Sequence, residues 1–260
     1  MSRNPKKVAK TLKQFAKNQK KGVAWLIDPE KVTSETWTHF SGFDNERSVP
    51  DLIFLGGSTY SGSGLNDLVT EIKNRCQAVP LVLFPGSRFQ FSEEADAILF
   101  LSLISGRNPE FLIDQQVQAA LSISQSGLEV LPTGYILVNN GEVLSVHQRS
   151  QTLPLLNTEK QKILQTALAG KLLGMKYIFL DAGSGALGSV APDIIELVKK
   201  QIGATPLMIG GGIDSLQKVH QSFSAGADLV VIGNGVEKNP GFLTEVLSYR
   251  NWLNHSLIIN

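Results

Sequence analysis

Three polar side chains follow short apolar runs in this sequence, and they are the residues best placed to carry chemistry. Asp28 and Ser58 each end a run near the N-terminus, and Asp181 ends a later one. Asp28 and Ser58 offer two hard oxygen ligands, which suits Mg²⁺ because that ion keeps several waters and shares the phosphates of a substrate. An aspartate in this place can equally cap the helix that follows it. The sequence leaves both roles open.

Glycine-rich turns follow three successive apolar runs in the second half of the chain. They are Gly183-Ser184-Gly185, Gly210-Gly211-Gly212 and Gly233-Asn234. A strand that ends in glycine and opens a helix presents backbone N–H groups and a helix N-terminus to a phosphate. In an eight-stranded barrel such a pair of turns is expected after strands seven and eight. We therefore predict a phosphate site here, in which Asp181 binds or deprotonates a hydroxyl of the ligand.

The elements that position these residues alternate along the whole chain. Short continuous apolar runs between helical patterns indicate strands buried on both faces of a parallel sheet. Eight such strands predict one (βα)₈ TIM barrel domain over residues 1–260, a routine length for this fold. The expected strands are 23–28, 51–56, 79–84, 96–101, 129–138, 177–181, 206–210 and 228–232. The expected helices are 34–41, 64–75, 108–126, 158–173, 191–202, 214–224 and 240–254.

One connection is too short for the regular pattern. Only residues 85–95 separate strands three and four, and a crossover with its helix needs at least about 10–12 residues before loops are added. We expect the full third helix to be missing and the outer wall to be open there. Phe89 and Phe91 beside the opening predict a groove for a long apolar ligand. A short helical turn that plugs the gap is the alternative. The long connection 139–158 is predicted to be a lid.

Bulk composition limits the partners of this protein. A net charge of +1 argues against a nucleic-acid surface spread over the molecule. One cysteine, no long apolar run and no secretory signal pattern predict a cytoplasmic location. Residues 1–21 form a predicted basic helix with eight Lys or Arg. This helix either closes the bottom of the barrel or makes transient contact with a membrane surface.

Seven collinear motifs resemble the geranylgeranylglyceryl phosphate synthase family, which includes the heptaprenylglyceryl phosphate synthases, and they favour its group II. The similarity spans roughly Val23 to Lys238. The motifs are Leu26-Ile-Asp-Pro-Glu-Lys31, Leu55-Gly-Gly-Ser58, Leu83-Phe-Pro-Gly86, the segment Ile98–Pro109, Asp181-Ala-Gly-Ser-Gly185, Gly210-Gly-Gly-Ile213 and Ile232-Gly-Asn234.

The resemblance implies a Mg²⁺-dependent barrel prenyltransferase that joins sn-glycerol 1-phosphate to a polyprenyl diphosphate such as geranylgeranyl diphosphate. It implies that Asp28 and Ser58 hold the metal, that the third helix is missing and that the protein forms a homo-oligomer. Carried over by position, the glycerol 1-phosphate site comprises Phe179, Leu180, Asp181, Ala182, Gly183, Ser184, Gly185, Gly211, Gly212, Gly233 and Asn234.

The chain departs from the family pattern on the ligand side. Phe179 and Asp181 stand where many members have Tyr and Glu, so the acid is kept and a phenol is lost. Gln148 and Gln151 lie near positions that usually carry Tyr and Asn. These differences predict altered substrate preference or weakened activity. Two alternatives stay open. One is another barrel enzyme, such as an isomerase or epimerase, that uses the same phosphate site on a sugar phosphate. The other is a phosphate-ligand binder whose catalysis faded with the lost phenol.

Overall fold

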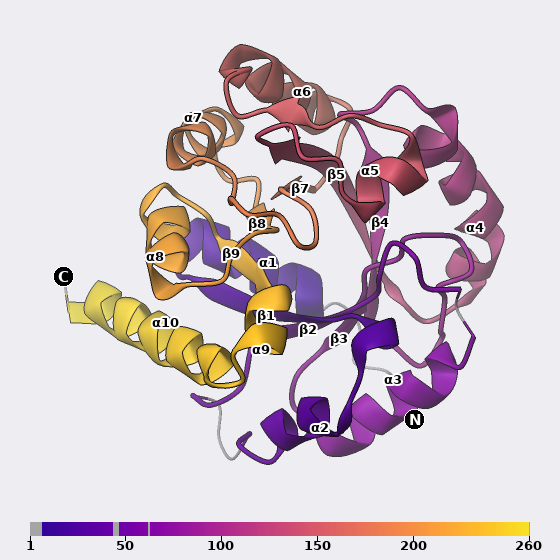
Figure 1. Ribbon diagram of the computed structural model, residues 1–260, viewed down its shortest axis with the longest axis vertical. Coiled ribbons are helices and arrows are strands. Elements are labelled where there is room, and N and C mark those ends of the chain that lie inside the picture. Colours follow the sequence, from indigo (N-terminus) through magenta and orange to yellow (C-terminus); the bar gives the residue numbers. More distant parts are fainter. Residues whose placement is uncertain (1–6, 44–46, 62, 260) are drawn as a thin grey trace.

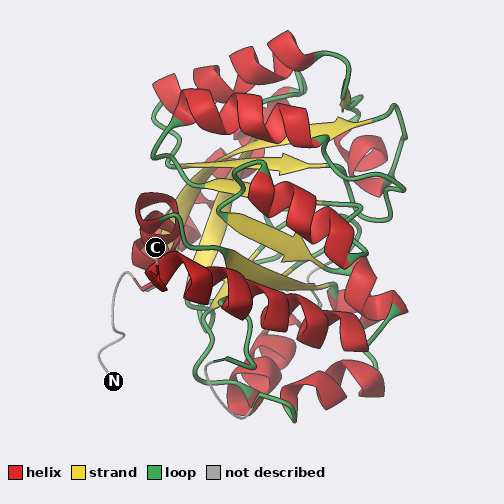
Figure 2. Cartoon of the chain, turned by 90° about the vertical axis from the view of Figure 1, so that its left-hand side faces the viewer, coloured by secondary structure: helices red, strands yellow, loops and turns green. Residues whose placement is uncertain are grey.

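The computed structural model describes residues 7–43, 47–61 and 63–259, and it confirms the barrel. Eight parallel strands form a closed ring, because β4 pairs with β5 as well as with β3, and helices surround it (Figures 1 and 2). The ring contains β1 (Gly22–Ile27), β2 (Leu52–Leu55), β3 (Leu81–Leu83), β4 (Ala97–Leu103), β5 (Glu129–Asn139), β7 (Tyr177–Asp181), β8 (Leu207–Gly210) and β9 (Leu229–Ile232). The short β6 (Leu155–Leu156) pairs with the end of β5 outside the ring.

The helices follow the predicted order, with two short additions near the C-terminal ends of the strands. These additions are α5 (Ser145–Ser150), within the predicted lid, and α9 (Asn234–Lys238), directly after β9. The others are α1 (Lys7–Asn18), η1 (Pro29–Lys31), α2 (Ser34–Phe40), α3 (Leu65–Arg75), η2 (Glu110–Asp114), α4 (Gln115–Gln125), α6 (Lys160–Leu172), α7 (Pro192–Ile202), α8 (Leu216–Ser224) and α10 (Gly241–Ile259).

The connection between β3 and β4 has no helix. Residues 84–96, all of them described, form only turns and bends. The predicted absence of a full third helix is therefore confirmed, and α4 is the next helix along the wall after α3 (Figure 1).

Helix α1 closes the bottom of the barrel. Its apolar side chains Val8, Leu12 and Phe15 are buried in the cluster that fills the barrel interior. The backbone N–H groups of Val8 and Ala9, which lack partners inside the helix, donate to the Glu129 carboxylate at the start of β5. The barrel therefore covers the face that a membrane surface would need. The predicted residues 1–6 of this helix lie outside the described part of the chain.

An aspartate directly precedes three of the strands, and its side chain extends the hydrogen bonding of the sheet at the bottom of the barrel. Asp51, Asp96 and Asp228 precede β2, β4 and β9. Each side chain accepts an N–H from the start of the neighbouring strand at 2.8 Å, donated by Val23, Leu81 and Leu207 respectively. The backbone N–H of each aspartate donates in return to the carbonyl oxygen of that same residue. The side chain thus replaces the strand residue that would otherwise accept that N–H. A buried backbone donor left without a partner is costly, so these carboxylates fix where the strands start.

Each of these aspartates also has a cationic partner. Arg250 lies 2.6 Å from Asp51, Lys73 lies 2.9 Å from Asp96, and Lys199 lies 2.6 Å from Asp228. The Asp228 side chain is 4% exposed and that of Asp96 is 39% exposed, so water screens the two pairs very differently.

Among the described residues, no helix is both long enough and apolar enough to cross a bilayer.

We predict that Asp228→Ala destabilises the protein far more than Asp96→Ala. The first change leaves the Leu207 N–H and the Lys199 ammonium without their partner in a buried place, which costs about 3–5 kcal/mol. In the second change the lost carboxylate is itself 39% exposed, and the Lys73 ammonium keeps the Glu94 carbonyl as an acceptor, so the cost should be about 1 kcal/mol. Urea unfolding followed by circular dichroism measures both. Equal losses would show that these carboxylates do not act through burial.

Candidate active site

The three glycine-rich turns meet at the C-terminal end of the barrel. Asn234 holds two of them together, because its Oδ1 accepts from the Ser184 hydroxyl at 2.9 Å and from the Gly185 N–H at 3.0 Å. Gly211 has a φ of +74°, and a Cβ there would lie 2.4 Å from the Gly183 nitrogen. Only glycine therefore lets the turn after β8 pack against the turn after β7.

Helix α9 completes the phosphate-binding geometry of a barrel. It begins at Asn234, immediately after β9, so its first N–H groups face the same end of the barrel as the turn after β8. Turns after the seventh and eighth barrel strands, with a short extra helix, form the usual phosphate site of this fold. Ser184, Gly185, Gly211 and Gly212 line one cavity there, together with Gly233 and Asn234.

Asp181 is a buried carboxylate in the wall of that cavity. Its side chain accepts a short hydrogen bond from the Tyr135 hydroxyl and another from the Gly183 N–H at 2.9 Å. Burial raises the pKa of the Asp181 carboxyl, and the hydrogen bonds from Tyr135 and Gly183 oppose that rise. Burial and the neighbouring carboxylate raise the pKa of Tyr135 well above its usual range, which keeps the phenol a donor.

Tyr135 is the site residue that sequence reasoning missed. It lies in the middle of β5, 46 residues before Asp181, where an aromatic side chain is typical of a strand core. Its ring packs against Phe84 and Phe179, with centroid separations of 5.9 and 5.5 Å. Phe84 and Phe179 also stack on each other at 5.5 Å. These three rings form the floor of the cavity.

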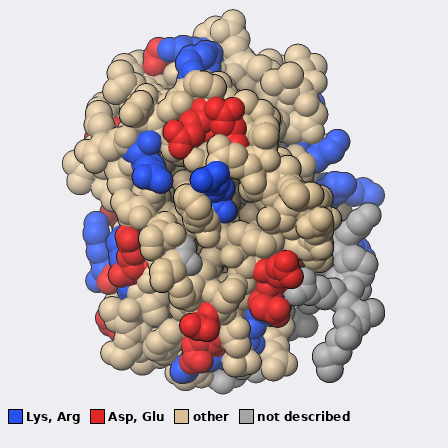
Figure 3. Space-filling view, turned by 90° about the vertical axis from the view of Figure 1, so that its right-hand side faces the viewer, with Lys and Arg blue, Asp and Glu red and all other residues tan. Residues whose placement is uncertain are grey.

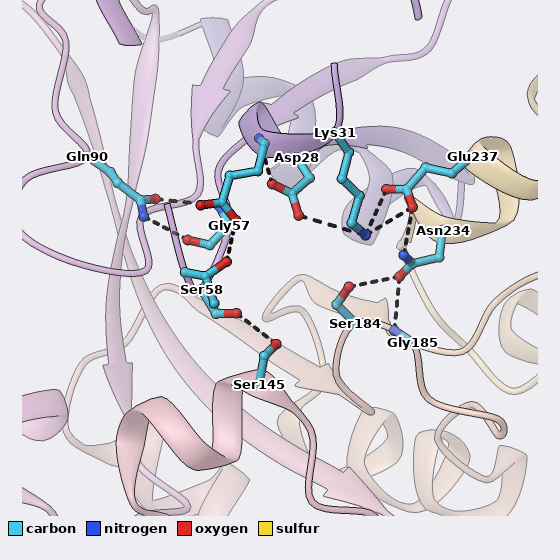
Figure 4. A network of polar contacts seen from close by, with 12 residues as sticks. Asp28, Lys31, Gly57, Ser58, Gln90, Ser145, Ser184, Gly185, Asn234 and Glu237 are labelled. Carbon is cyan, nitrogen blue, oxygen red and sulfur yellow. Dashed lines mark hydrogen bonds and ion pairs between the residues drawn. The ribbon is translucent and has the colours of Figure 1, made fainter. Parts of the chain in front are cut away.

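Asp28 has the capping role, one of the two roles that the sequence left open. Its Oδ1 accepts from the Glu30 N–H at 3.1 Å and so caps η1, while its Oδ2 lies 3.8 Å from the Lys31 ammonium (Figure 4). The carboxylate is 19% exposed and lines the cavity, so it remains accessible to a ligand. Burial raises the pKa of Asp28, and the Glu30 N–H and the Lys31 charge oppose that rise. Lys31 also pairs with Glu237 of α9 at 3.0 Å.

Ser58 lies beside Asp28 at the end of β2. A Cβ at the preceding residue, Gly57, would lie 2.8 Å from Asp28 Oδ1, so the strand ends are in close contact. The Ser58 hydroxyl lies 2.9 Å from that of Ser145, the first residue of α5 (Figure 4). The predicted lid is therefore attached to the predicted metal ligand. In the described residues no group of three or more His, Cys, Asp or Glu side chains is arranged so that it could hold a metal ion.

The cavity continues from the glycine turns to the gap where the third helix is missing. Its volume is about 510 Å³. The far end lies between β3, β4 and α4. Helix α4 itself has no charged residue, and on the side of the molecule in Figure 3 uncharged surface separates small clusters of charged side chains. The apolar residues that line this end include Phe91, Ile98, Phe100, Ala119 and Ile123. Phe91 thus lies where the sequence predicts a groove, whereas Phe89 is 61% exposed and its ring contacts Arg88.

Some predicted ligand residues face away from the cavity. Leu180 and Ala182 are fully buried against the surrounding helices, because alternate residues of a strand point to opposite faces. Gly183 lies behind Asp181 and contributes the N–H that holds its carboxylate. Of the positions that depart from the family pattern, Gln148 and Gln151 are exposed and lie outside the cavity lining.

The chain is similar to a known family over nearly its whole length. The model of the PcrB family matches residues 16–249. A protein named geranylgeranylglyceryl phosphate synthase from Chitinophaga pinensis is 41% identical over 240 residues, which cover 91% of this chain and 94% of that protein. A protein of the same name from Thermococcus gammatolerans is 37% identical over 214 residues, covering 82% and 83% of the two chains.

A solved structure agrees with the fold and carries a ligand. The crystal structure of (S)-3-O-geranylgeranylglyceryl phosphate synthase from Thermoplasma acidophilum, in complex with its substrate sn-glycerol 1-phosphate, superposes with a TM-score of 0.82. The identity is 26%, and the alignment covers 93% of this chain and 95% of the other.

We predict that Tyr135→Phe raises the pKa of Asp181 above its wild-type value. The change leaves the carboxyl buried and removes one of the two donors that favour its charged form. A pH titration of the carboxyl ¹³C shift, with Asp181 assigned through Asp181→Asn, measures the midpoint. Tyr177→Phe, which removes a hydroxyl at the start of the same strand as Asp181, is the matched control and should leave the midpoint unmoved. A midpoint that stays constant or falls in Tyr135→Phe would contradict the assignment.

Proposed function

The chain belongs to the PcrB family, and from that membership and the shape of its cavity we propose that it is a prenyltransferase. Its substrates are sn-glycerol 1-phosphate and geranylgeranyl diphosphate or a similar polyprenyl diphosphate, and its products are an ether-linked prenylglyceryl phosphate and diphosphate. The observation that carries this proposal is one continuous cavity. It joins a glycine-rich phosphate cradle to an apolar groove, with the Asp181 carboxylate in its wall.

The phosphate of glycerol 1-phosphate fits the glycine-rich end. There the backbone around Gly211, Gly212 and Gly233 lines the cavity, with Ser184 and Asn234 beside it. Backbone N–H groups and a helix N-terminus bind a dianion without a cationic side chain. The glycerol 1-phosphate named in the complex of the Thermoplasma acidophilum protein supports this part of the proposal.

Asp181 is the proposed base. The free hydroxyl of glycerol 1-phosphate donates its proton to the carboxylate as its oxygen bonds to the allylic carbon, and the bond from that carbon to diphosphate breaks. Tyr135 and Gly183 hold the carboxylate in place, so it reacts without having to be oriented first. Because Asp181 must be ionised to accept the proton, its raised pKa predicts that activity falls on the acid side at a higher pH than for an ordinary aspartate.

Asp28 and Ser58 fit a magnesium ion with few protein ligands. Both offer hard oxygens on one side of the cavity, and within the described part of the chain Asp28 Oδ2 accepts no hydrogen bond. Bound Mg²⁺ would neutralise charge on the diphosphate oxygens, which makes diphosphate a better leaving group. Lys31 adds a positive charge on the same side, although Glu237 shares it.

The prenyl chain is assigned to the end of the cavity between β3, β4 and α4. Its lining is apolar there, and it lies where a third helix would otherwise cover the strands. A hydrocarbon chain gains about 25 cal/mol for each Å² removed from water, so a groove of this kind binds it without polar contacts. Homo-oligomerisation stays a prediction.

Incubation with glycerol 1-phosphate, labelled geranylgeranyl diphosphate and Mg²⁺ tests the function directly. We expect a labelled prenylglyceryl phosphate and stoichiometric diphosphate. Conversion of a sugar phosphate without a prenyl donor would favour the isomerase alternative. Tight glycerol 1-phosphate binding with no product would favour a binder with faded catalysis.

We predict that Asp28→Ala lowers kcat by at least about 10²-fold, the scale of losing one charge-stabilising group in an active site. Circular dichroism should show an unchanged fold. Asp214→Ala is the matched control, since Asp214 is a carboxylate on the same cavity that pairs with Lys218 at 2.8 Å. Full Mg²⁺-dependent turnover in Asp28→Ala would remove the metal assignment.

We predict that Phe91→Asp raises the KM for geranylgeranyl diphosphate strongly and leaves glycerol 1-phosphate affinity unchanged. A carboxylate facing a hydrocarbon chain costs several kcal/mol or must take up a proton. Phe89→Asp should have little effect, because that side chain is already in water. Steady-state kinetics and calorimetry measure the two substrates separately. An equal loss of affinity for both substrates in Phe91→Asp would indicate a folding defect and would contradict the assignment of the prenyl groove.

A further inference from the structure

Gln90 is a buried amide in the connection that replaces the third helix. It is 2% exposed and lies in residues 84–96, which no helix stabilises. Buried amides are costly unless their hydrogen-bonding groups find partners, so the contacts of Gln90 show what it holds.

All polar atoms of the Gln90 side chain are engaged. Its Nε2 donates to the carbonyl oxygens of Gly57 at 2.7 Å and of Tyr60 at 2.8 Å. Its Oε1 accepts from the Gly86 N–H at 2.9 Å and lies 3.5 Å from the Gly57 nitrogen (Figure 4). Gln90 therefore forms hydrogen bonds with the turn after β2 on both sides of Ser58, and it connects this turn to the turn after β3.

The two turns that Gln90 joins touch through their backbones. A Cβ at Gly86 would lie 2.5 Å from the Gly57 oxygen and 2.9 Å from the Ser58 Cα. A Cβ at Gly56 would lie 1.8 Å from the Phe84 oxygen. No side chain lies between them at these points, and Gln90 adds side-chain hydrogen bonds to the backbone contact between the two turns.

Ser58 depends on this arrangement. Gly57 and Tyr60 lie on either side of Ser58 in the chain, and the Gln90 side chain donates to the backbone carbonyl oxygens of both. The Ser58 hydroxyl is then presented to the cavity next to Asp28 and to Ser145 of α5.

We propose that Gln90 is a positioning residue that fixes the turn carrying Ser58, and through it the diphosphate and metal end of the active site. The proposal rests on the function proposed above. It also gives the missing helix a role, because a connection that folds back over the strand ends brings a side chain to the turn after β2. A helix packed on the outer wall would lie away from that turn.

Two variants at this position test the proposal. Gln90→Met keeps the length and removes every hydrogen bond, and Gln90→Glu keeps the acceptor while it loses both donors. In Gln90→Met we expect the Mg²⁺ concentration for half-maximal rate and the KM for geranylgeranyl diphosphate to rise roughly 10–100-fold, as for other outer residues that orient metal ligands. Gln90→Glu should show at least as large a rise, since it sets a carboxylate against two carbonyl oxygens. Glycerol 1-phosphate affinity by calorimetry should stay within about twofold, because the glycine turns are untouched.

Two further measurements do not depend on turnover. Hydrogen–deuterium exchange of the segment 56–61 should speed up in Gln90→Met, and electron paramagnetic resonance should show weaker Mn²⁺ binding in the presence of inorganic diphosphate. Gln118→Met is the matched control. Gln118 is an exposed glutamine of α4 that binds Arg88 of the same connection and does not reach the turn after β2.

These experiments distinguish an error in the role of Gln90 from an error in the proposed function. If the wild-type protein is active, and Gln90→Met has the same Mg²⁺ requirement and the same KM for geranylgeranyl diphosphate, the role of Gln90 alone is overturned. Equal weakening of both substrates, with a lowered Tm, would also overturn it, because it would show a general role in folding. Wild-type protein that makes no prenylglyceryl phosphate would overturn the proposed function itself.

Discussion

The burial of the Asp181 carboxylate is the constraint on which the glycine-rich end of the site depends. A carboxylate inside a protein needs donors, and this one receives them from the Tyr135 hydroxyl and the Gly183 N–H. The register of β5 against β7 brings Tyr135 beside Phe179, two residues before Asp181, and the turn after β7 supplies the Gly183 N–H. The same packing excludes any side chain at Gly211, because a Cβ there would lie 2.5 Å from Asp181 Oδ1. Glycine at this position therefore leaves room for the Asp181 carboxylate, in addition to allowing the close packing of the two glycine-rich turns.

On the opposite side of the cavity, side-chain contacts connect the ends of β1 and β2 to short helices that follow later strands. Asp28, Lys31 and Glu237 connect the end of β1 to α9 through ion pairs, and Ser58 meets Ser145 of α5 (Figure 4). Partly exposed pairs of this kind contribute little to stability, which leaves their geometry free to change when a charged ligand arrives. The barrel floor is built differently, with aspartate carboxylates that accept backbone N–H groups at the starts of the strands. The mouth of the cavity thus combines partly exposed ion pairs around Lys31 with a turn after β2 that the buried Gln90 amide holds by hydrogen bonds.

Much of this architecture could be predicted from sequence, and the failures have physical causes. Buried parallel strands are continuous apolar runs, and the missing helix follows from counting residues 85–95, so both are local signals. Helices α5 and α9 have six and five residues, too few for a periodic pattern, and they depend on tertiary contacts. Neither the choice between Phe89 and Phe91 nor the partner of Tyr135 is encoded locally. Both depend on how distant strands are aligned around the ring.

Phe179 shows why a departure from a family pattern must be read in three dimensions. From the sequence, phenylalanine at this position means that a phenol is lost from the glycerol phosphate site. In the structure the ring of Phe179 lies beneath the cavity against Tyr135, and the phenol next to the acid comes from Tyr135 on β5. An edge-on aromatic contact of this kind orients the tyrosine ring, and the hydrogen bond it makes possible favours the charged form of Asp181. The aromatic ring at 179 therefore helps to place the hydrogen-bond donor of the Asp181 carboxylate, and the sequence change by itself does not predict a loss of catalysis.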